Sequence, residues 1–225
     1  MEQSKLDLMR KKLAEEGVLM MDPSAVWVEE TVKVGRGTLL LPGTILRGST
    51  VVGENCEIGP NTMLVDCTVG DGSTVNSAQC SESEIGKHCE IGPYTHLRPH
   101  SVVEDGSKIG AFVQLKNCNL GKGTKMAHLT YVGDADVGDN CNFGCGTVTC
   151  NYDGKKKFRT VIGDNCFLGC NTNLVAPVTL GNGVYTAAGS TVTRDVEADA
   201  LVIARARQEV KPGWAAEHRK KKVKK

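Results

Sequence analysis

The stretch VGRGTLLLPGTILRGSTVVGENCEIGPNTML, residues 34–64, places an aliphatic residue at every sixth position. These positions are Val34, Leu40, Leu46, Val52, Ile58 and Leu64. A period of six is neither the 3.6-residue repeat of an amphipathic helix nor the two-residue repeat of a half-buried strand. It is typical of a parallel β-helix, in which each short strand stacks on the equivalent strand of the next coil and buries its aliphatic residue.

The same spacing continues over most of the remaining chain. It resumes at Val69 and Val75, at Ile85, Ile91, Leu97, Val103, Ile109 and Leu115, at Leu120, Met126 and Val132, at Val137 and Phe143, and at Ile162, Leu168, Leu174, Leu180, Thr186 and Val192. Aromatic residues are only 4% of the chain and 26 positions are Gly, which disfavours an ordinary core built on large rings. We therefore predict an all-β fold with coils over residues 23–205.

Small residues recur four places after the aliphatic position. They are Thr38, Thr44, Thr50, Cys56, Thr62, Cys89, Cys141, Cys166 and Thr172. Several of the ten cysteines are thus predicted to fill space in a packed ladder. The chain has no CxxC pair and no apolar leader, so we expect reduced thiols and a cytoplasmic protein without a membrane span.

The two ends of the chain depart from the repeat. Residues 4–16 are predicted to form a helix that Gly17 ends, within an N-terminal linker and cap of residues 1–22. Residues 216–225 carry six Lys and Arg against one Glu, whereas the whole chain has a net charge of +1. We interpret residues 206–225 as an irregular, solvated basic tail, and we predict no nucleic-acid partner.

A second departure is CNYDGKKKFRT, residues 150–160, where the repeat lapses between Phe143 and Ile162. Polar and basic residues gather there. Loops that project from a rigid scaffold are where binding and catalytic residues concentrate. We therefore expect a functional loop at this position.

The segments from Ala127 to Asp164 and from Leu97 to Lys116 resemble the acetyltransferase domain of the bifunctional N-acetylglucosamine-1-phosphate uridyltransferase/glucosamine-1-phosphate acetyltransferase family. HLTY (residues 128–131) and NYDG (residues 151–154) are the specific motifs, and LVAPVTLGNGVYTAAGSTVTRDV extends the match. The resemblance implies a left-handed β-helix, and a product that serves UDP-N-acetylglucosamine synthesis for peptidoglycan and lipopolysaccharide. No segment resembles the uridyltransferase half, so both a stand-alone enzyme and a half of a bifunctional enzyme stay open.

The chemistry that the resemblance implies is acetyl transfer from acetyl-CoA to the amine of glucosamine 1-phosphate. The amine must be neutral to attack, so a positioned base helps, and the resemblance assigns His128 to that role. A sugar phosphate needs converging cations and hydrogen-bond donors. The resemblance assigns Arg98, Lys116, Tyr131 and Lys157 to the sugar phosphate and Asn142 to sugar hydroxyls.

For acetyl-CoA, the resemblance implies contacts with Cys145, Asn151, Tyr152, Cys170, Ala188 and Arg205, and no metal. A backbone N–H near Cys145 is our candidate donor to the carbonyl oxygen as it gains charge. Three positions depart from the family pattern. Gln114 replaces a usual Glu, Cys145 a usual Ala, and Cys170 a usual Ser; an acetylated cysteine is disfavoured because no base accompanies either thiol.

The resemblance also implies a homotrimer whose active sites are shared between neighbouring subunits. Two alternatives compete with this interpretation. One is another hexapeptide enzyme, such as a serine, maltose or lipid-A-pathway acyltransferase, or a zinc-dependent carbonic anhydrase, for which only His96 and His100 form a close histidine pair. The other is a scaffold without catalysis, which would not require His128 together with the cations.

Overall fold

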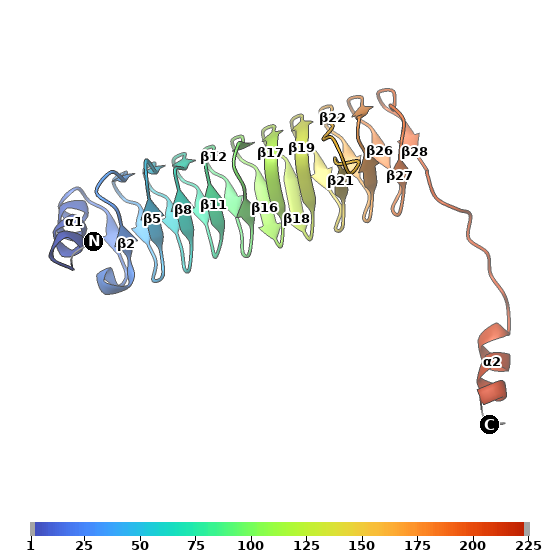
Figure 1. Cartoon of the computed structure of the whole chain (residues 1–225), viewed down its shortest axis with the longest axis horizontal. Helices are drawn as coiled ribbons and strands as arrows, with labels where there is room; N and C mark the ends of the chain where they lie inside the picture. Colours follow the sequence, from blue (N-terminus) through green and yellow to red (C-terminus); the bar gives the residue numbers. More distant parts are fainter. Residues whose placement is uncertain (1–2, 223–225) are drawn as a thin grey trace.

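A computed structural model, which describes residues 3–222, shows a long parallel β-helix and confirms the predicted fold class (Figure 1). Each coil contributes one strand to each of three faces, and successive coils pair in parallel. Two helices lie at the ends of this described part, α1 (Gln3–Glu15) and α2 (Trp214–Lys222), with a 3-10 turn at Pro23–Ala25.

Face 1 is the 11-stranded sheet. Its strands are β1 (Leu19–Met20), β4 (Leu39–Leu40), β7 (Glu57–Ile58), β10 (Thr74–Val75), β13 (Glu90–Ile91), β16 (Lys108–Ala111), β18 (Lys125–His128), β20 (Asn142–Phe143), β23 (Phe167–Leu168), β26 (Tyr185–Thr186) and β28 (Leu201–Val202).

The 17-stranded sheet supplies the other two faces, which are joined where strands β17 and β19 bend around an edge. Face 2 contains β2 (Trp27–Val28), β5 (Ile45–Arg47), β8 (Met63–Val65), β11 (Gln79–Ser81), β14 (His96–Leu97), the first parts of β17 (Gln114–Leu120) and β19 (Tyr131–Val137), β21 (Val148–Cys150), β24 (Asn173–Val175) and β27 (Thr191–Val192). Face 3 contains β3 (Lys33–Val34), β6 (Val51–Val52), β9 (Thr68–Val69), β12 (Ser83–Ile85), β15 (Ser101–Val103), the second parts of β17 and β19, β22 (Thr160–Ile162) and β25 (Val178–Leu180).

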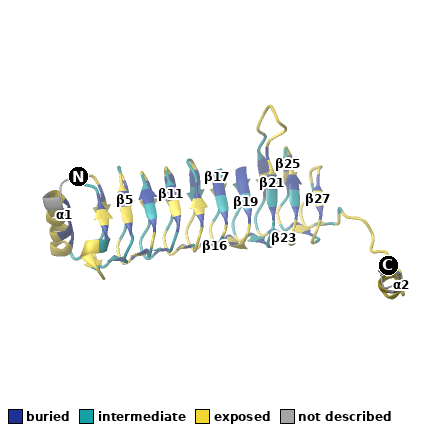
Figure 2. Ribbon diagram, turned by 60° about the horizontal axis from the view of Figure 1, so that its bottom comes forward, coloured by how far each residue is buried: buried dark blue, intermediate teal, exposed yellow. Residues whose placement is uncertain are grey.

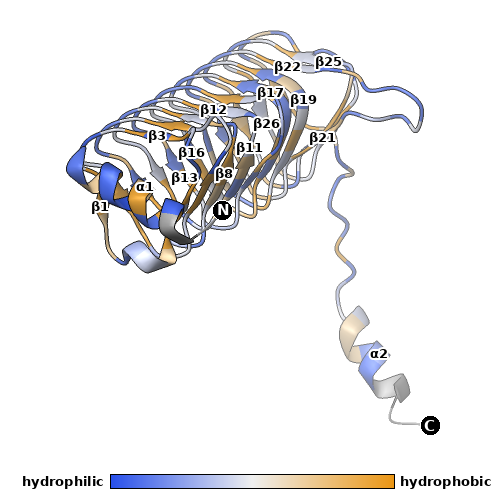
Figure 3. Ribbon diagram, turned by 60° about the vertical axis from the view of Figure 1, so that its left-hand side comes forward, coloured by the Kyte–Doolittle hydropathy of each residue, from blue (hydrophilic) through white to orange (hydrophobic). Residues whose placement is uncertain are grey.

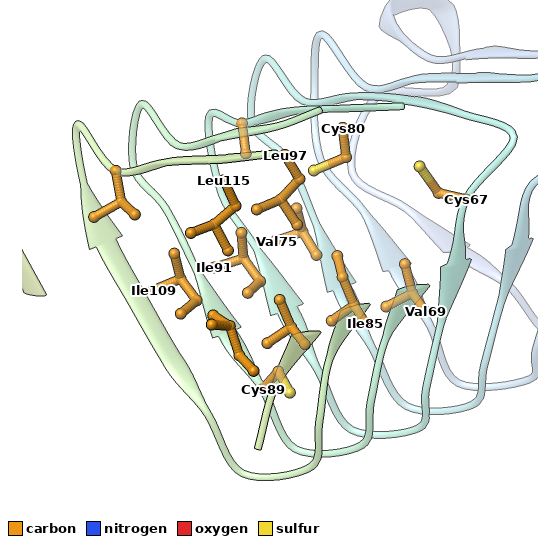
Figure 4. Packing of buried hydrophobic residues seen from close by; sticks show 14 of the residues in the cluster. Cys67, Val69, Val75, Cys80, Ile85, Cys89, Ile91, Leu97, Ile109 and Leu115 are labelled. Carbon is orange, nitrogen blue, oxygen red and sulfur yellow. The ribbon is translucent and has the colours of Figure 1, made fainter. Parts of the chain in front are cut away.

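The six-residue register forms the interior of the prism (Figure 4). Leu97, Leu115 and Val132 lie directly above one another on face 2, and all three are fully buried. Two interior positions were not indicated by the aliphatic pattern. Cys80 lies between Leu64 and Leu97, and Thr149 pairs with Leu174. A small polar side chain therefore fills an interior position where the sequence pattern lapses.

The predicted ladder of small residues is confirmed. Its members are buried, and most of their hydroxyl or thiol groups donate to carbonyl oxygens of the next coil, as from Thr44 Oγ1 to Ile58 O at 2.9 Å and from Cys56 Sγ to Gly70 O at 3.2 Å, whereas Thr172 Oγ1 donates to Gly169 O of its own coil. Burial raises the pKa of the Cys56 thiol. These cysteines therefore serve packing, because a buried polar group is tolerated when it has a hydrogen-bond partner.

Helix α1 covers the open end of the first coil. Leu6, Met9 and Leu13 are buried there, and Arg10 Nη2 donates to Val26 O at 2.7 Å. Gly17, at φ +91°, ends the helix as predicted.

At the other end, an extended segment after β28 leads to the exposed helix α2 (Figure 1). This short helix was not predicted for the basic tail. Within the described residues, no helix is long and apolar enough to cross a membrane.

Candidate active site

The break in the repeat forms a hairpin that projects from the prism beside β21 (Figures 2 and 3). Phe158 N donates to Asn151 O at 2.8 Å, and Tyr152 and Lys157 form an antiparallel bridge. Asp153 Oδ1 accepts two hydrogen bonds from backbone N–H groups of the turn. The sequence predicted a projecting loop here, and its closed geometry gives Lys157 a defined position.

Three cations meet where this hairpin returns to the prism. Lys116 follows Leu115 on β17, and Arg98 follows Leu97 one coil earlier. Contact with the ammonium group of Lys157 lowers the pKa of Lys116, and the charge of Arg98 lowers it further. Like charges at short range oppose one another, so this arrangement favours a bound anion that lies between them.

Tyr131 lies on the outer side of face 2 in the next coil, and its hydroxyl lies over Gly133 of the same strand. Gly133, the partner of Lys116 in the strand register, makes this possible. A Cβ at Gly133 would lie 2.2 Å from the Tyr131 hydroxyl and 2.9 Å from Asn151 Nδ2. The absent side chain therefore leaves room for a hydrogen-bond donor beside Lys116.

A buried carboxylate lies beneath this group. Asp134 is only 7% exposed and bends the chain at φ +49°. Asn117 Nδ2 donates to its Oδ1 and Asn151 Nδ2 to its Oδ2, each at 2.5 Å. The charge of Asp134 opposes the lowering of the Lys116 pKa. We name this corner of the prism, which Asn117, Asp134 and Asn151 form between faces 2 and 3, the cation edge.

His128 lies at a different corner, between faces 1 and 2. It ends β18 and pairs with Ala111, and its imidazole is exposed. Continuing the register of β18, β20, β23 and β26 places Cys145, Cys170 and Ala188 above it, one in each following coil. We name this corner, defined by these four residues, the histidine edge.

The histidine edge offers unpaired backbone donors. The backbone N–H groups of Cys145, Cys170 and Ala188 have no hydrogen-bond acceptor within the described part of the chain. The equivalent residues of earlier coils include Pro42 and Pro60, which carry no N–H. The later coils therefore leave a column of donors that a thioester and an amide chain could use.

Two further predicted residues flank the histidine edge. Arg205 extends over Gly189, with its Cδ 3.6 Å from the place that a Cβ of that glycine would take. Asn142, on the outer side of face 1, lines a groove of about 300 Å³ together with Lys108, Lys125 and Ala127. Asn142 and Arg205 thus lie on the same group of coils as the histidine edge.

Gln114, the departure from the family pattern, does not meet His128 in the described chain. Its Nε2 lies 3.4 Å from Nδ1 of His96 on the outer side of face 2. Partial burial lowers the pKa of His96, and Arg98 lowers it further. No group of three His, Cys, Asp or Glu side chains in residues 3–222 is arranged to hold a metal ion.

The structure thus divides the predicted site residues between two corners. Arg98, Lys116, Tyr131, Lys157, Asn151 and Tyr152 belong to the cation edge and its hairpin, whereas His128, Cys145, Cys170, Ala188, Arg205 and Asn142 lie at or beside the histidine edge. Each corner holds residues predicted for both substrates.

Three residues at the cation edge were not indicated by sequence reasoning. Asn117 and Asp134 precede Asn151 at equal spacings of seventeen residues, which is a signal of stacked corners. Arg159 follows Lys157 by two positions, and its Nε and Nη2 donate to the two carboxylate oxygens of Asp136. The signal in the sequence that could have identified Arg159 is its positive charge at the end of the predicted loop.

The family described as bacterial transferase hexapeptide (six repeats) matches residues 31–65, 82–117 and 159–194. The chain therefore contains the hexapeptide repeats of this transferase family over these three stretches.

More particularly, the chain is similar to bifunctional GlmU proteins. It is 52% identical over 211 residues to that of Caldanaerobacter subterraneus subsp. tengcongensis, covering 94% of this chain and 46% of the relative. It is 43% identical over 215 residues to that of Thermodesulfovibrio yellowstonii, covering 95% and 48%. The chain spans about half the length of the curated relatives that it matches.

Among solved structures, the UDP-N-acetylglucosamine acyltransferase of Arabidopsis is 17% identical, with a TM-score of 0.49 over 84% of this chain and 68% of the other. LpxA from Acinetobacter baumannii is also 17% identical, with a TM-score of 0.40 over 86% and 77%.

Proposed function

We propose that this chain transfers the acetyl group of acetyl-CoA to the amine of glucosamine 1-phosphate. The observation that carries the proposal is the meeting of Arg98, Lys116 and Lys157 beside the Tyr131 hydroxyl, on a hexapeptide-repeat prism. A phosphate dianion would relieve the repulsion among these cations, and Asp134 beneath them leaves a net charge of about +2 for the dianion to neutralise.

His128 supplies the base in this proposal. As the sugar nitrogen attacks the acetyl carbon, an N–C bond forms, the imidazole accepts the proton of the nitrogen, and the C–S bond breaks so that the thiol leaves with a proton. The exposed imidazole has no side-chain hydrogen bond within the described residues, so it is free to approach an amine. Asn142, in the adjacent groove, would hold sugar hydroxyls.

The donor would follow the histidine edge. The free N–H group of Cys145 lies one coil from His128, where it could bind the carbonyl oxygen, and those of Cys170 and Ala188 continue in the same direction. Arg205 would meet a phosphate group of the donor at the far end. Asn151 and Tyr152 lie at the other corner, so their contact with the donor requires a second subunit.

We propose a homotrimer for this reason. An active site that needs the histidine edge and the cation edge is completed when the cation edge of one copy faces the histidine edge of the next. A ridge of exposed apolar side chains, Tyr94, Phe112 and Leu129, borders the histidine edge. The rings of Tyr94 and Phe112 stack at 5.2 Å, and Leu129 continues the ridge in the next coil, so the ridge offers an apolar contact surface for a second copy.

The first test is release of free thiol from acetyl-CoA by the purified protein, with glucosamine 1-phosphate, glucosamine 6-phosphate, glucosamine and serine as parallel acceptors. Release with glucosamine 1-phosphate alone, abolished by His128→Ala, would support both substrate and base. Equal release with unphosphorylated glucosamine would contradict the phosphate site, and no release with any acceptor would favour a scaffold.

Shared sites have their own test. The His128→Ala protein and a protein that carries both Arg98→Ala and Lys116→Ala, each expected to be inactive alone, are unfolded and refolded together. In a random mixture about a quarter of shared sites would combine an intact histidine edge with an intact cation edge, so activity should return to about that fraction. No recovery from a mixture that sediments as mixed trimers would show that each subunit works alone.

We retain the predicted division of the chain into residues 1–22, 23–205 and 206–225, and the pathway role in UDP-N-acetylglucosamine synthesis. The ten cysteines are all free in the structure, which fits a reducing compartment and our proposal of a cytoplasmic enzyme. A metal is not part of the proposed acetyl transfer.

A further inference from the structure

Arg159 fastens the foot of the hairpin to the prism. Its guanidinium group grips both carboxylate oxygens of Asp136, and it also donates to Asn117 O at 3.2 Å and to Ala135 O at 3.1 Å. These contacts cross three successive coils. Both side chains of the ion pair are less than half exposed, so water screens them less than a fully exposed pair.

The position of Arg159 matters because Lys157 is only two residues away. The hairpin side chains from Tyr152 to Lys157 are exposed, and packing against the prism does not hold them. Repulsion from Lys116 and Arg98 would push Lys157 outward when no anion is present. A restraint at the foot of the hairpin opposes that movement.

We propose that Arg159 is the positioning residue of the anion site: it fixes the hairpin so that Lys157 stays beside Lys116 and Arg98, ready for a phosphate group. The inference rests on the proposed function for the identity of the phosphate ester. It concerns a residue that sequence resemblance did not assign.

The geometry favours arginine over lysine at this position. A planar guanidinium can bind one carboxylate with two nitrogens while the remaining N–H groups reach two carbonyl oxygens, and a single ammonium cannot reproduce this arrangement. Asp136 is itself held by Asn119, whose Nδ2 donates to Oδ1 at 2.6 Å. The bond with Arg159 lowers the pKa of Asp136, so the ion pair also persists into more acidic solution than an ordinary aspartate would allow.

The test compares Arg159→Lys with Lys155→Ala, which removes an exposed cation from the same hairpin but not from the anion site. For Arg159→Lys we expect the KM for glucosamine 1-phosphate to rise about tenfold, with kcat and the KM for acetyl-CoA changed by less than about twofold. Lys155→Ala should leave all three unchanged. A loss of kcat with an unchanged KM would overturn the positioning role.

A double-mutant cycle separates positioning from general stability. If Arg159 acts through Lys157, Arg159→Lys should raise the KM about tenfold in the wild-type background and by less than about twofold in Lys157→Ala. Equal factors in the two backgrounds would show that Arg159 acts elsewhere, and the proposal would fail.

Two measurements remain informative if the enzyme uses a different acceptor. Hydrogen exchange of the amides at residues 152–158 should accelerate in Arg159→Lys and not in Lys155→Ala. Binding of inorganic phosphate, followed by calorimetry, should weaken about tenfold in Arg159→Lys. Unchanged exchange and unchanged phosphate binding would overturn the inference, whereas lack of acetyl transfer by the wild type would overturn only the proposed function.

Discussion

The interior of the prism and the cation edge differ in whether their polar and charged groups have partners. Inside, most hydroxyl and thiol groups of the ladder donate to a carbonyl oxygen of the next coil, and aliphatic residues fill the remaining space. At the cation edge, Arg98, Lys116 and Lys157 lie together above one buried carboxylate, so positive charge is left unbalanced. The repeat thus provides stability, and its interruption provides an unsatisfied site that a ligand can complete.

The largest expected effect lies at the histidine edge. His128→Ala should lower kcat by a factor of about 10² to 10⁴, because the amine then lacks a positioned base. Steady-state acetyl transfer measures kcat, and far-ultraviolet circular dichroism should show unchanged strand content since the imidazole is exposed. A kcat within threefold of the wild-type value would remove His128 from the mechanism and leave its corner without a catalytic group.

Most of the interior was predictable from the sequence, for physical reasons. Interior positions recur at a fixed spacing of six residues along the sequence, so this spacing alone places Leu97 and Leu115 inside the prism. The spacing of aliphatic residues does not predict that Cys80 and Thr149 are interior. They lie inside because their strands pair in register with those of neighbouring coils, not because their side chains are aliphatic. In a sequence, a small residue at an interior position cannot be told from a small residue in a corner or a loop.

The candidate site was less predictable because it depends on contacts between coils. Resemblance named His128 and the cations, but periodicity alone could not show that they divide between two corners. Arg159 and Asp134 act on neighbouring coils through side-chain geometry, which a linear pattern does not encode. The unpaired N–H of Cys145 likewise depends on how the backbone donors of successive coils are paired, and no sequence pattern marks it.

The stability of the protein should depend on the volume of the buried interior side chains and not on exposed ion pairs at the surface. Leu115→Ala removes a fully buried side chain, so the free energy of unfolding should fall by about 2–5 kcal/mol. Urea unfolding measures the change. Lys108→Ala, which breaks an exposed pair with Glu90, serves as the control and should cost less than about 1 kcal/mol. Equal losses in the two variants would contradict a stability that resides in the interior.

Alkaline pH offers a milder test of the interior. Burial raises the pKa of Cys118 to about 11, above the value of about 8.5 expected in the unfolded chain. The folded state therefore binds more protons between these values, and stability is complete below pH about 8.5 and falls as pH rises toward 11.

For Cys118 alone, we expect a loss of about 1–2 kcal/mol between pH 8.5 and pH 10.5. Urea unfolding at several pH values should show a shallower decline for Cys118→Ala than for the wild type. Cys170→Ala, which alters an exposed thiol, is the matched control and should keep the wild-type slope. If Cys118→Ala also kept that slope, the buried thiol would not be the source of the effect.

The smallest expected effect concerns the two thiols of the histidine edge. Its size shows whether backbone N–H groups or sulfur atoms contact acetyl-CoA. In our proposal the backbone N–H groups of Cys145 and Cys170 make the contact, and every residue except proline supplies that group. Cys145→Ala and Cys170→Ser should therefore change the KM for acetyl-CoA by less than about threefold, as steady-state assays with varied acetyl-CoA would show. A tenfold or larger change would assign the contact to the sulfur atoms, and the departures from the family pattern would then alter donor binding. A small change would leave the histidine edge as a proposed site made by backbone geometry, in contrast to the cation edge, where our proposal assigns binding to side chains.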